Sequence, residues 1–333
     1  MNLDIVIPIY NEHENLPELY HRLRAVLDQL QGVTGTVIYV NDGSRDESLT
    51  LMLKQSAEDP RFTVVDLSRN FGHQAALSAG LAHSTGHAVV LMDGDLQDPP
   101  EVIPELFRAW KQGAQVVRAE RKSRREKGIR RLGFELFHAF FRWVSDFPIQ
   151  SHSGIFGLLD RQVVQELNHF TEKNRFFPGL RSWVGFRQES VFYDRQDRAA
   201  GKPKQSFKRL VRYALDAVFS FSYKPLRLMT GLGLMISTVG FVLAVFFVVK
   251  RLTGVETAQT GFTTLVTLVL FLGGIQLVAI GLLGEYLARI YDEVKHRPLY
   301  IVRQRYGPQR TDPAEANSSG RSEAEPESGK AVT

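Results

Sequence analysis

The sequence predicts an α/β domain with a mostly parallel sheet, followed by amphipathic helices and a two-helix transmembrane hairpin. Early in the chain, short apolar runs of strand length alternate with longer runs whose apolar residues recur at helical spacing. This alternation is typical of a parallel sheet covered by helices on both faces. Two long and almost uncharged segments come later, and each is long enough to cross a bilayer as a helix.

The positions of these runs define the expected elements of the sheet domain. Strands are predicted at residues 3–9, 36–40, 62–67, 88–92 and 114–118, and helices at 14–30, 46–57, 73–83 and 100–112. Polar motifs directly follow the first four strands: Tyr10-Asn11-Glu12, Asn41-Asp42-Gly43-Ser44, Ser68-Arg69-Asn70 and Asp93-Gly94-Asp95. Because open α/β sheets bind ligands beyond the carboxyl ends of their strands, we expect a polar ligand at this edge.

The composition limits the classes of function. The chain has 333 residues and a net charge of +5, with basic clusters at residues 118–131 and 202–212. Each cluster is either a solvated basic face or a site for phospholipid headgroups, a phosphorylated ligand or nucleic acid. There is no cysteine, which excludes disulfides and thiolate chemistry. The start of the chain, MNLDIVIPIYNE, does not have the pattern of a signal peptide.

The stretch VVLMDGDLQDPP at residues 89–100 indicates a metal site. Asp93, Asp95 and Gln97 offer hard oxygen ligands of the kind that suit Mg²⁺ or Mn²⁺, and Mg²⁺ is commonly shared with substrate phosphates. The same letters describe many ordinary turns, and a calcium loop would need a longer acidic series. Here, however, the motif follows the fourth strand whose end is expected to face the ligand, so it predicts carboxylates that share a metal with a diphosphate. Asp42 can accept hydrogen bonds from a nucleobase or ribose, although Asn-Asp-Gly is also a common turn.

The last third of the chain carries the membrane segments. Residues 226–249 and 261–284 are the expected transmembrane helices, joined by a short external loop at 250–260. Basic residues outside this loop outnumber those within it, so the positive-inside rule places both chain ends in the cytoplasm. This predicts a multi-pass membrane protein with a cytoplasmic domain at residues 1–200.

Two amphipathic stretches and the tail complete the organisation. Residues 128–146 and the juxtamembrane residues 201–225 are either surface helices or, given their aromatic and basic residues, helices lying in the membrane interface. Residues 285–307 are expected to form a cytoplasmic segment. The tail at 308–333 is rich in Pro, Ser, Gly and Glu, which predicts disorder.

Several motifs resemble those of the family 2 glycosyltransferases with a GT-A fold. They are VIPIYNE (6–12), VNDGS (40–44), LSRNFGHQAALSAG (67–80) and MDGDLQDPPE (92–101). SFSYKPLRL (220–228) and GEYLARIYDEVKHRPLYIV (284–302) are similar to the polyprenyl-phosphate branch, which includes bactoprenol glucosyltransferases and dolichol-phosphate mannose synthases. The resemblance extends to about residue 306. It implies a GT-A (Rossmann-like) domain as the catalytic domain, and it implies that the membrane is a bacterial inner (cytoplasmic) membrane.

The resemblance also implies roles for individual residues. A nucleotide pocket would be lined by Pro8, Tyr10 and Glu12, with Asp42 reading the base and Asp93 against the ribose or diphosphate. Asp95 and Gln97 would bind the metal, with Asp93 as a further ligand, and Asp95 would also count as catalytic. Arg198 and Lys204 would be the basic residues that grip phosphates of donor or acceptor.

One segment departs from the family pattern. In SHSGIFGLLDR (151–161), Ile155 stands where the family usually has Asp, and Gly157 where it usually has Arg. A phosphate monoester is mostly dianionic at neutral pH, so such an acceptor needs positioning and charge compensation more than a general base. We therefore still expect activity. His152, Ser153 and Asp160 are the nearby polar candidates, with Asp160 taken as a catalytic candidate.

These observations predict a metal-dependent transfer of sugar from a nucleoside-diphosphate sugar, with UDP-glucose as the expected donor, to undecaprenyl phosphate at the cytoplasmic membrane face. The resemblance implies inversion at the anomeric carbon. The alternatives are another donor sugar, such as N-acetylglucosamine, mannose or an aminoarabinose derivative, or a binding-only paralogue. A processive polysaccharide synthase is disfavoured because two spans leave no room for a channel. A nucleic-acid binder is disfavoured because the basic clusters flank membrane helices. Assembly as a homo-oligomer is implied by the resemblance alone.

Overall fold

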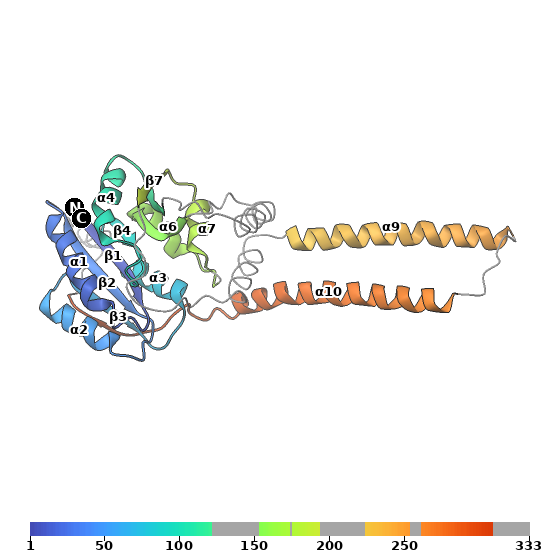
Figure 1. Cartoon of the computed structure of the whole chain (residues 1–333), viewed down its shortest axis with the longest axis horizontal. Coiled ribbons are helices and arrows are strands. Elements are labelled where there is room, and N and C mark those ends of the chain that lie inside the picture. The colour runs from blue at the N-terminus through green and yellow to red at the C-terminus, as the bar shows by residue number, and fades with distance from the viewer. Residues whose placement is uncertain (122–152, 174, 194–223, 254–260, 309–333) are drawn as a thin grey trace, which may run out of the picture. The chain divides into compact units, whose positions relative to one another are not determined.

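The computed structural model describes residues 1–121, 153–173, 175–193, 224–253 and 261–308 (Figure 1). These residues fall into two compact units. One unit holds a sheet with its helices, built from the described residues up to 193 together with residues 298–308. The other holds two long apolar helices.

Some of the sequence-based predictions concern residues outside these ranges. They are the amphipathic helix at 128–146, most of the juxtamembrane stretch at 201–225 and of the loop at 250–260, the tail beyond residue 308, and the candidates His152, Arg198 and Lys204. They remain predictions.

The first unit is built on an eight-stranded sheet with the order β7-β5-β6-β4-β1-β2-β3-β8 among the described residues. Its strands are β1 (Asn2–Ile9), β2 (Thr34–Asn41), β3 (Phe62–Leu67), β4 (Ala88–Leu91), β5 (Val116–Arg121), β6 (Ser153–Asp160), β7 (Gln188–Tyr193) and β8 (Val302–Tyr306). The pairs β1–β2, β1–β4, β2–β3 and β5–β7 are parallel. The pairs made by β6 with β4 and β5, and by β8 with β3, are antiparallel. The sheet is therefore the mixed, mostly parallel type of a GT-A fold.

Helices cover both faces of this sheet (Figure 1). The elements are α1 (Leu16–Gln29), α2 (Ser48–Glu58), α3 (His73–Ala82), the 3₁₀ turn η1 (Pro100–Val102), α4 (Ile103–Lys111), α6 (Arg161–His169) and α7 (Phe177–Trp183). Apolar residues of α1, α2 and α4 pack into one cluster with alternate residues of β1, such as Ile5 and Ile7. On the opposite face, Gly80 of α3 lies so close to Val6 and Val40 that a Cβ would be 2.1 Å from Val6 Cγ1. Burial of both faces explains the continuous apolar strands in the sequence.

The predicted strands and helices of the first 121 residues are all present, with bounds that differ by a few residues. Five elements were not predicted from the sequence: β6, α6, α7, β7 and β8. The strand β8 lies within the predicted cytoplasmic segment at 285–307 and pairs with β3 at the edge of the sheet.

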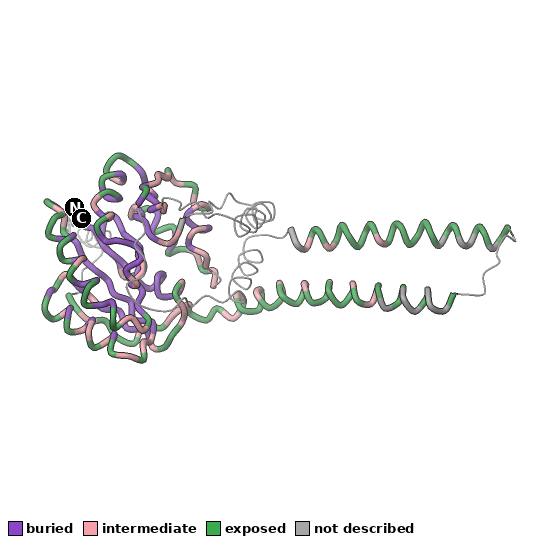
Figure 2. Tube along the Cα trace, in the orientation of Figure 1, coloured by how far each residue is buried: buried purple, intermediate pink, exposed green. Residues whose placement is uncertain are grey.

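The second unit consists of α9 (Lys224–Leu252) and α10 (Phe262–Val294). Both helices contain a segment apolar enough to cross a membrane, at Leu226–Leu243 and Phe271–Val294. Their described large apolar side chains are mostly exposed, in contrast to the buried sheet of the first unit (Figure 2). An exposed apolar surface of this extent is typical of a lipid-facing helix rather than of a soluble core. The helix α10 also runs beyond the predicted span end at residue 284.

Candidate active site

Four loops meet at the carboxyl edge of the sheet. Because β1 pairs in parallel with β2 and β4, and β2 with β3, these strands all end at the same edge. Their last residues are Ile9, Asn41, Leu67 and Leu91. The polar motifs that follow them are therefore brought together by the topology, as the sequence predicts.

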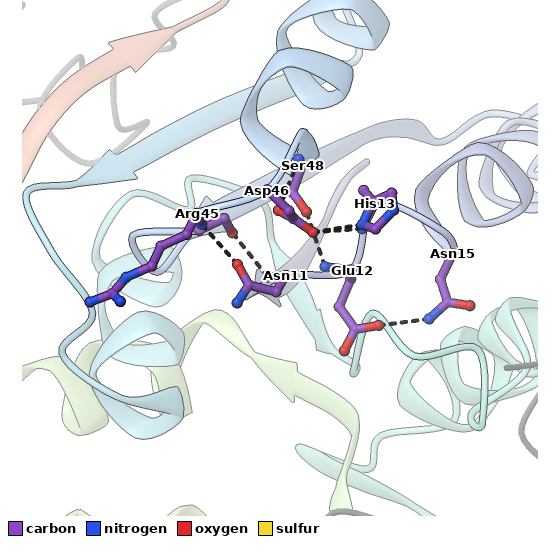
Figure 3. A network of polar contacts seen from close by, with 8 residues as sticks. Asn11, Glu12, His13, Asn15, Arg45, Asp46 and Ser48 are labelled. Carbon is purple, nitrogen blue, oxygen red and sulfur yellow. Dashed lines mark hydrogen bonds and ion pairs between the residues drawn. The ribbon is translucent and has the colours of Figure 1, made fainter. Parts of the chain in front are cut away.

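The loop after β1 is tied to the loop after β2 by paired hydrogen bonds (Figure 3). The amide of Asn11 donates to Ser44 Oγ at 3.2 Å, and the amide of Arg45 donates to Asn11 Oδ1 at 2.8 Å. The Nδ1 of His13 lies 2.8 Å from Asp46 Oδ2. These bonds hold the two loops together, and each one satisfies a backbone or side-chain polar group that would otherwise need water.

Glu12 lies in the same network, and its position bears on its predicted role in a nucleotide pocket. Its amide donates to Ser48 Oγ at 3.0 Å, and its Oε2 accepts from Asn15 Nδ2 at 2.6 Å (Figure 3). The carboxylate therefore also organises the start of α1. Of the other predicted pocket residues, Pro8 is buried at the end of β1, whereas Tyr10 is 40% exposed and available to a ligand.

Asp42 is buried and locks the loop after β2 to the loop after β3. Its Oδ1 accepts from the amide of Phe71 at 2.7 Å, and its Oδ2 accepts from the amide of Gly72 at 3.0 Å. Burial raises the pKa of this carboxyl, although the two amide bonds and the charge of His73 oppose the rise. Both oxygens keep a further lone pair, so a role in reading the base is compatible with this arrangement.

Asp93 pairs with a residue that the sequence analysis did not select, His73 at the start of α3. The His73 Nε2 lies 2.8 Å from Asp93 Oδ1. Burial by itself lowers the pKa of His73, but the hydrogen bond to Asp93 and the charges of Asp93, Asp42 and Asp95 outweigh it, so the pKa is raised. His73 can therefore carry a positive charge beside three carboxylates at this edge.

The turn Asp95-Leu96-Gln97 has a strained backbone. Leu96 is buried and has φ of 60°, a left-handed conformation that is rare for a bulky residue. The amide of Gln97 donates to Asp95 Oδ1 at 3.2 Å, and the Gln97 side chain is largely buried. Gly94 packs closely on the end of β1, because a Cβ there would lie 2.5 Å from Ile9 Cδ1 and would displace the end of that side chain. Strain of this kind is often retained where it serves a function, and here it lies between two predicted metal ligands.

Asp98 forms a buried cluster beside these carboxylates. The hydroxyl of Tyr193, at the end of β7, donates to Asp98 Oδ1 in a short hydrogen bond. The Nη2 of Arg121 lies 3.5 Å from the same oxygen, and the Arg121 Nε donates to the Tyr193 hydroxyl at 3.2 Å. Burial raises the pKa of Asp98, and the negative charges of Asp93 and Asp95 add to the rise. Arg121 therefore brings a cation to the acidic end of β4.

The donor set fits a hard divalent cation that shares its coordination with a substrate. No three acidic or histidine side chains within the described ranges converge to hold an ion by themselves. Asp93, Asp95 and Gln97 offer carboxylate and amide oxygens on one short turn. Mg²⁺ commonly uses one or two carboxylates and completes its shell with waters and phosphate oxygens. In such a shared site the protein supplies only part of the coordination shell of the ion.

The departures from the family pattern on β6 have a structural setting. A Cβ on Gly157 would lie 2.5 Å from the carbonyl oxygen of Val117 and 3.2 Å from Arg181 Nη1, so a side chain does not fit. The buried Arg181 of α7 donates to the carbonyl oxygens of Gly154 at 2.8 Å and Ile155 at 3.3 Å. Burial, together with the charge of Arg118, lowers the pKa of Arg181 to about 10. An arginine from α7 thus occupies the space beside Gly157 and fixes the start of β6.

Asp160 lies away from the other candidates. It ends β6 opposite Ala88, the first residue of β4, and so belongs to the other edge of the sheet. Its Oδ1 accepts from the amide of Gln162 at 2.9 Å as the N-cap of α6, and its Oδ2 accepts from Trp110 Nε1 at 2.8 Å. Both contacts indicate a structural role. Ser153, by contrast, begins β6 opposite Glu120.

Four residues of this site were not selected from the sequence: His73, Asp98, Arg121 and Tyr193. His73 and Asp98 lie inside the quoted motifs, where each could have been read as another polar group of a strand-end loop. Tyr193 is 95 residues from Asp98, and no local pattern indicates their contact.

Comparison with known proteins places this geometry in a family. Residues 4–167 match the glycosyl transferase family 2 model, and residues 224–290 match the GtrB C-terminal hairpin. YkcC of Bacillus subtilis, described as an uncharacterized glycosyltransferase, is 41% identical over 304 residues, which cover 91% of this chain and 94% of that protein. The bactoprenol glucosyl transferase of Shigella phage SfV is 38% identical over 304 residues, covering 91% and 98%.

A solved structure is also similar to this chain. The mannosyltransferase PcManGT of Pyrobaculum calidifontis, in complex with GDP-Man and Mn²⁺, is 14% identical, with a TM-score of 0.44 over 84% of this chain and 86% of that one. The two relatives that match over almost their whole length show the family of this chain. The chain belongs to glycosyltransferase family 2, with a GtrB C-terminal hairpin, and it is a glycosyltransferase.

Proposed function

We propose that the protein transfers glucose from UDP-glucose to undecaprenyl phosphate at the cytoplasmic face of the membrane, with inversion at the anomeric carbon. The observation that carries this proposal is the group of acidic and amide side chains at the end of β4, beside Arg121, in a chain with two helices able to span a membrane. The names of relatives such as the bactoprenol glucosyl transferase of phage SfV support the same acceptor class.

The donor would bind across the carboxyl edge of the sheet. The hydrogen-bonded loops after β1, β2 and β3 form a preorganised wall with the exposed Tyr10 on it, which suits a nucleoside. Asp93, Asp95 and Gln97 would hold a divalent cation, Mg²⁺ or Mn²⁺. When bound, this ion offsets negative charge on the diphosphate as it departs. A raised pKa keeps His73 available as a cation beside the same carboxylates.

The acceptor phosphate needs no strong base. Its second pKa is about 6, so the phosphate is mostly dianionic and already nucleophilic at neutral pH. This oxygen forms the new bond to the anomeric carbon, and the bond from that carbon to the diphosphate breaks, which releases UDP. Arg121 is a second cation beside the acidic turn, in addition to His73, and it can compensate the charge of a lipid phosphate. Arg198 and Lys204 remain proposed partners of the same phosphates.

The membrane hairpin would hold the protein where its lipid acceptor lies. α9 and α10 are proposed to cross the membrane as a pair, with both chain ends in the cytoplasm by the positive-inside rule. Assembly as a homo-oligomer through these helices is also proposed. A binding-only paralogue is the second reading, favoured by Ile155 and Gly157, which stand where the family usually has a carboxylate and an arginine.

A transfer assay in detergent tests the proposal. Radiolabelled sugar would be supplied as UDP-glucose, with other UDP- and GDP-sugars in parallel, to purified protein with undecaprenyl phosphate and Mg²⁺ or Mn²⁺. We expect labelled lipid that is lost with EDTA and reduced roughly 100-fold or more by Asp95→Asn. Labelling from another sugar would correct the donor. A folded protein that binds nucleotide and labels lipid with no donor would instead support the binding-only reading.

A further inference from the structure

The strand β8 ends the described chain by returning to the sheet after α10. It pairs antiparallel with β3, where Val64 faces Tyr306, Val65 faces Arg305 and Asp66 faces Gln304. The register then shifts, because Leu67 faces Val302 instead of Arg303. A shift of this kind is a bulge, and bulges commonly re-aim a side chain. Here the residue at the bulge is Arg303.

Arg303 contacts two groups at the carboxyl end of β3. Its Nη1 lies 3.3 Å from Asp66 Oδ2, and its Nη2 donates to the carbonyl oxygen of Ser68 at 2.6 Å. Asp66 is 1% exposed, so its carboxylate depends on protein partners in place of water. An exposed arginine on the returning strand therefore compensates a buried charge inside the nucleotide-binding half of the sheet.

The first connection from Arg303 to the active-site loops runs through Asp66. The Asn41 Nδ2 donates to Asp66 Oδ1 at 2.7 Å, and Asn41 Oδ1 accepts from the amide of Ser44 at 3.1 Å. The hydroxyl of Ser44 in turn accepts from the amide of Asn11 at 3.2 Å. A continuous hydrogen-bonded path thus joins Arg303 to the loops after β2 and β1.

The second connection runs through Ser68 and the loop that follows it. A Cβ on Gly43 would lie 2.5 Å from both Arg69 C and Asn70 N, so the loops after β2 and β3 are in direct backbone contact. The Asp42 carboxylate accepts from the amides of Phe71 and Gly72 in the same loop. Holding the Ser68 carbonyl therefore also restrains Asp42.

We propose that Arg303 is a positioning residue for nucleotide-sugar binding: from the strand that follows the membrane hairpin, it fixes the loop Asp42–Ser44 through Asp66 and Asn41. This inference rests on the proposed nucleotide-sugar donor. Without Arg303, the buried Asp66 carboxylate must find another donor or take up a proton, and either change disturbs its bond with Asn41. Affinity for the nucleotide falls, while the turn at Asp93–Gln97 is not altered.

Arg305 provides a matched control on the same strand. It is also an exposed arginine, but it faces Val65 and lines a small cavity of about 60 Å³ with Asp4, Thr36 and His83 near the opposite edge of the sheet. Replacing it removes the same charge from the same strand without touching Asp66 or Ser68. The comparison of Arg303→Ala with Arg305→Ala therefore separates positioning from a general effect of charge or of β8 pairing.

The experiment measures UDP and GDP binding by calorimetry on full-length protein in detergent, together with KM for UDP-glucose, KM for undecaprenyl phosphate and kcat. Arg303→Ala is expected to weaken nucleotide binding and to raise the KM for the donor by about 10-fold, while kcat and the KM for the acceptor stay within about 2-fold of wild type. Arg305→Ala is expected to change none of these quantities by more than about 2-fold. Arg303→Lys keeps the charge but not both contacts, so it is expected to be intermediate.

If Arg303→Ala lowers stability, the same substitution made in an Asp66→Asn variant still tests the proposal. In Asp66→Asn the buried charge is absent, and Arg303→Ala should then have less than half of its effect on binding. Equal binding by wild type, Arg303→Ala and Arg303→Lys would overturn the inference, as would a loss confined to kcat. A wild-type protein that binds neither UDP nor GDP would contradict the proposed donor itself, which is a different result.

Discussion

Gly43→Ala should damage the loop after β2 in a way that can be calculated from the structure. Gly43 has φ of 65°, and an added Cβ would lie 2.5 Å from Arg69 C and Asn70 N. Two effects therefore combine, a strained backbone and a clash with backbone atoms that cannot rotate away. Gly32 separates them, because it has φ of 72° and nothing within 4 Å of its Cβ position.

The expected magnitudes differ between the two variants. A left-handed conformation costs about 1–2 kcal/mol for a residue with a Cβ, and the reduced entropy of the unfolded chain offsets about 0.4–1 kcal/mol of this. Gly32→Ala should therefore lower the free energy of unfolding by about 1 kcal/mol. Overpacking adds about 1–3 kcal/mol at Gly43, so Gly43→Ala should lower it by about 2–4 kcal/mol.

Urea unfolding followed by tryptophan fluorescence measures both variants, since two of the three tryptophans, Trp110 and Trp183, lie in the sheet unit. Nucleotide binding is measured in parallel. Gly43→Ala should weaken UDP binding by about 10-fold or more, because Asp42 must move with Gly43, whereas Gly32→Ala should leave binding unchanged. Equal losses of stability in the two variants would refute the argument that the loops after β2 and β3 are in tight contact.

Three further variants test other parts of the account. Asp160→Ala removes the N-cap of α6 and the Trp110 contact, so it should lower the free energy of unfolding by about 1–2 kcal/mol. The rate of sugar transfer should stay within about 2-fold of wild type. A large loss of transfer activity at unchanged stability would instead support a catalytic role for Asp160. Tyr193→Phe removes a hydrogen bond from the buried Asp98 carboxylate and should cost about 1–3 kcal/mol in thermal or urea unfolding, and no change would argue against the Asp98 cluster. Hydrogen bonds from Arg61 lower the pKa of the buried Asp59, so its stabilisation is present above the ordinary carboxyl pKa and is lost as pH falls through the lowered value. Asp59→Asn should therefore lower stability by about 2 kcal/mol at pH 7 and progressively less below about pH 4, and a difference that is constant with pH would contradict this.

The elements of the first 121 residues were predictable because each apolar run is bounded by a clear turn and buried on both faces of the sheet. β8 was not, because VRQRY contains no apolar run. It is a strand only because the edge of β3 offers unpaired backbone groups, and its exposed face tolerates arginine. β6 was quoted as a departure from a family motif and not recognised as the antiparallel strand between β4 and β5.

The candidate site was predictable where it depends on strand ends and not where it depends on distant contacts. Asp42, Asp93 and Asp95 follow β2 and β4 directly, and parallel pairing brings those ends together. The bond between Tyr193 and Asp98 requires knowledge that β7 lies beside β5, which no local pattern supplies. The position of Asp160 depends in the same way on the antiparallel direction of β6, which moves it to the other edge.

The most direct test of the account is Mn²⁺ binding in the presence of UDP, measured by electron paramagnetic resonance on the full-length protein in detergent. Asp95→Asn and Asp160→Asn make the same chemical change at opposite edges of the sheet. We expect UDP-dependent Mn²⁺ binding by wild type and Asp160→Asn, and its loss in Asp95→Asn. Equal capture by all three proteins, or loss only in Asp160→Asn, would contradict the assignment of the metal and diphosphate to the end of β4.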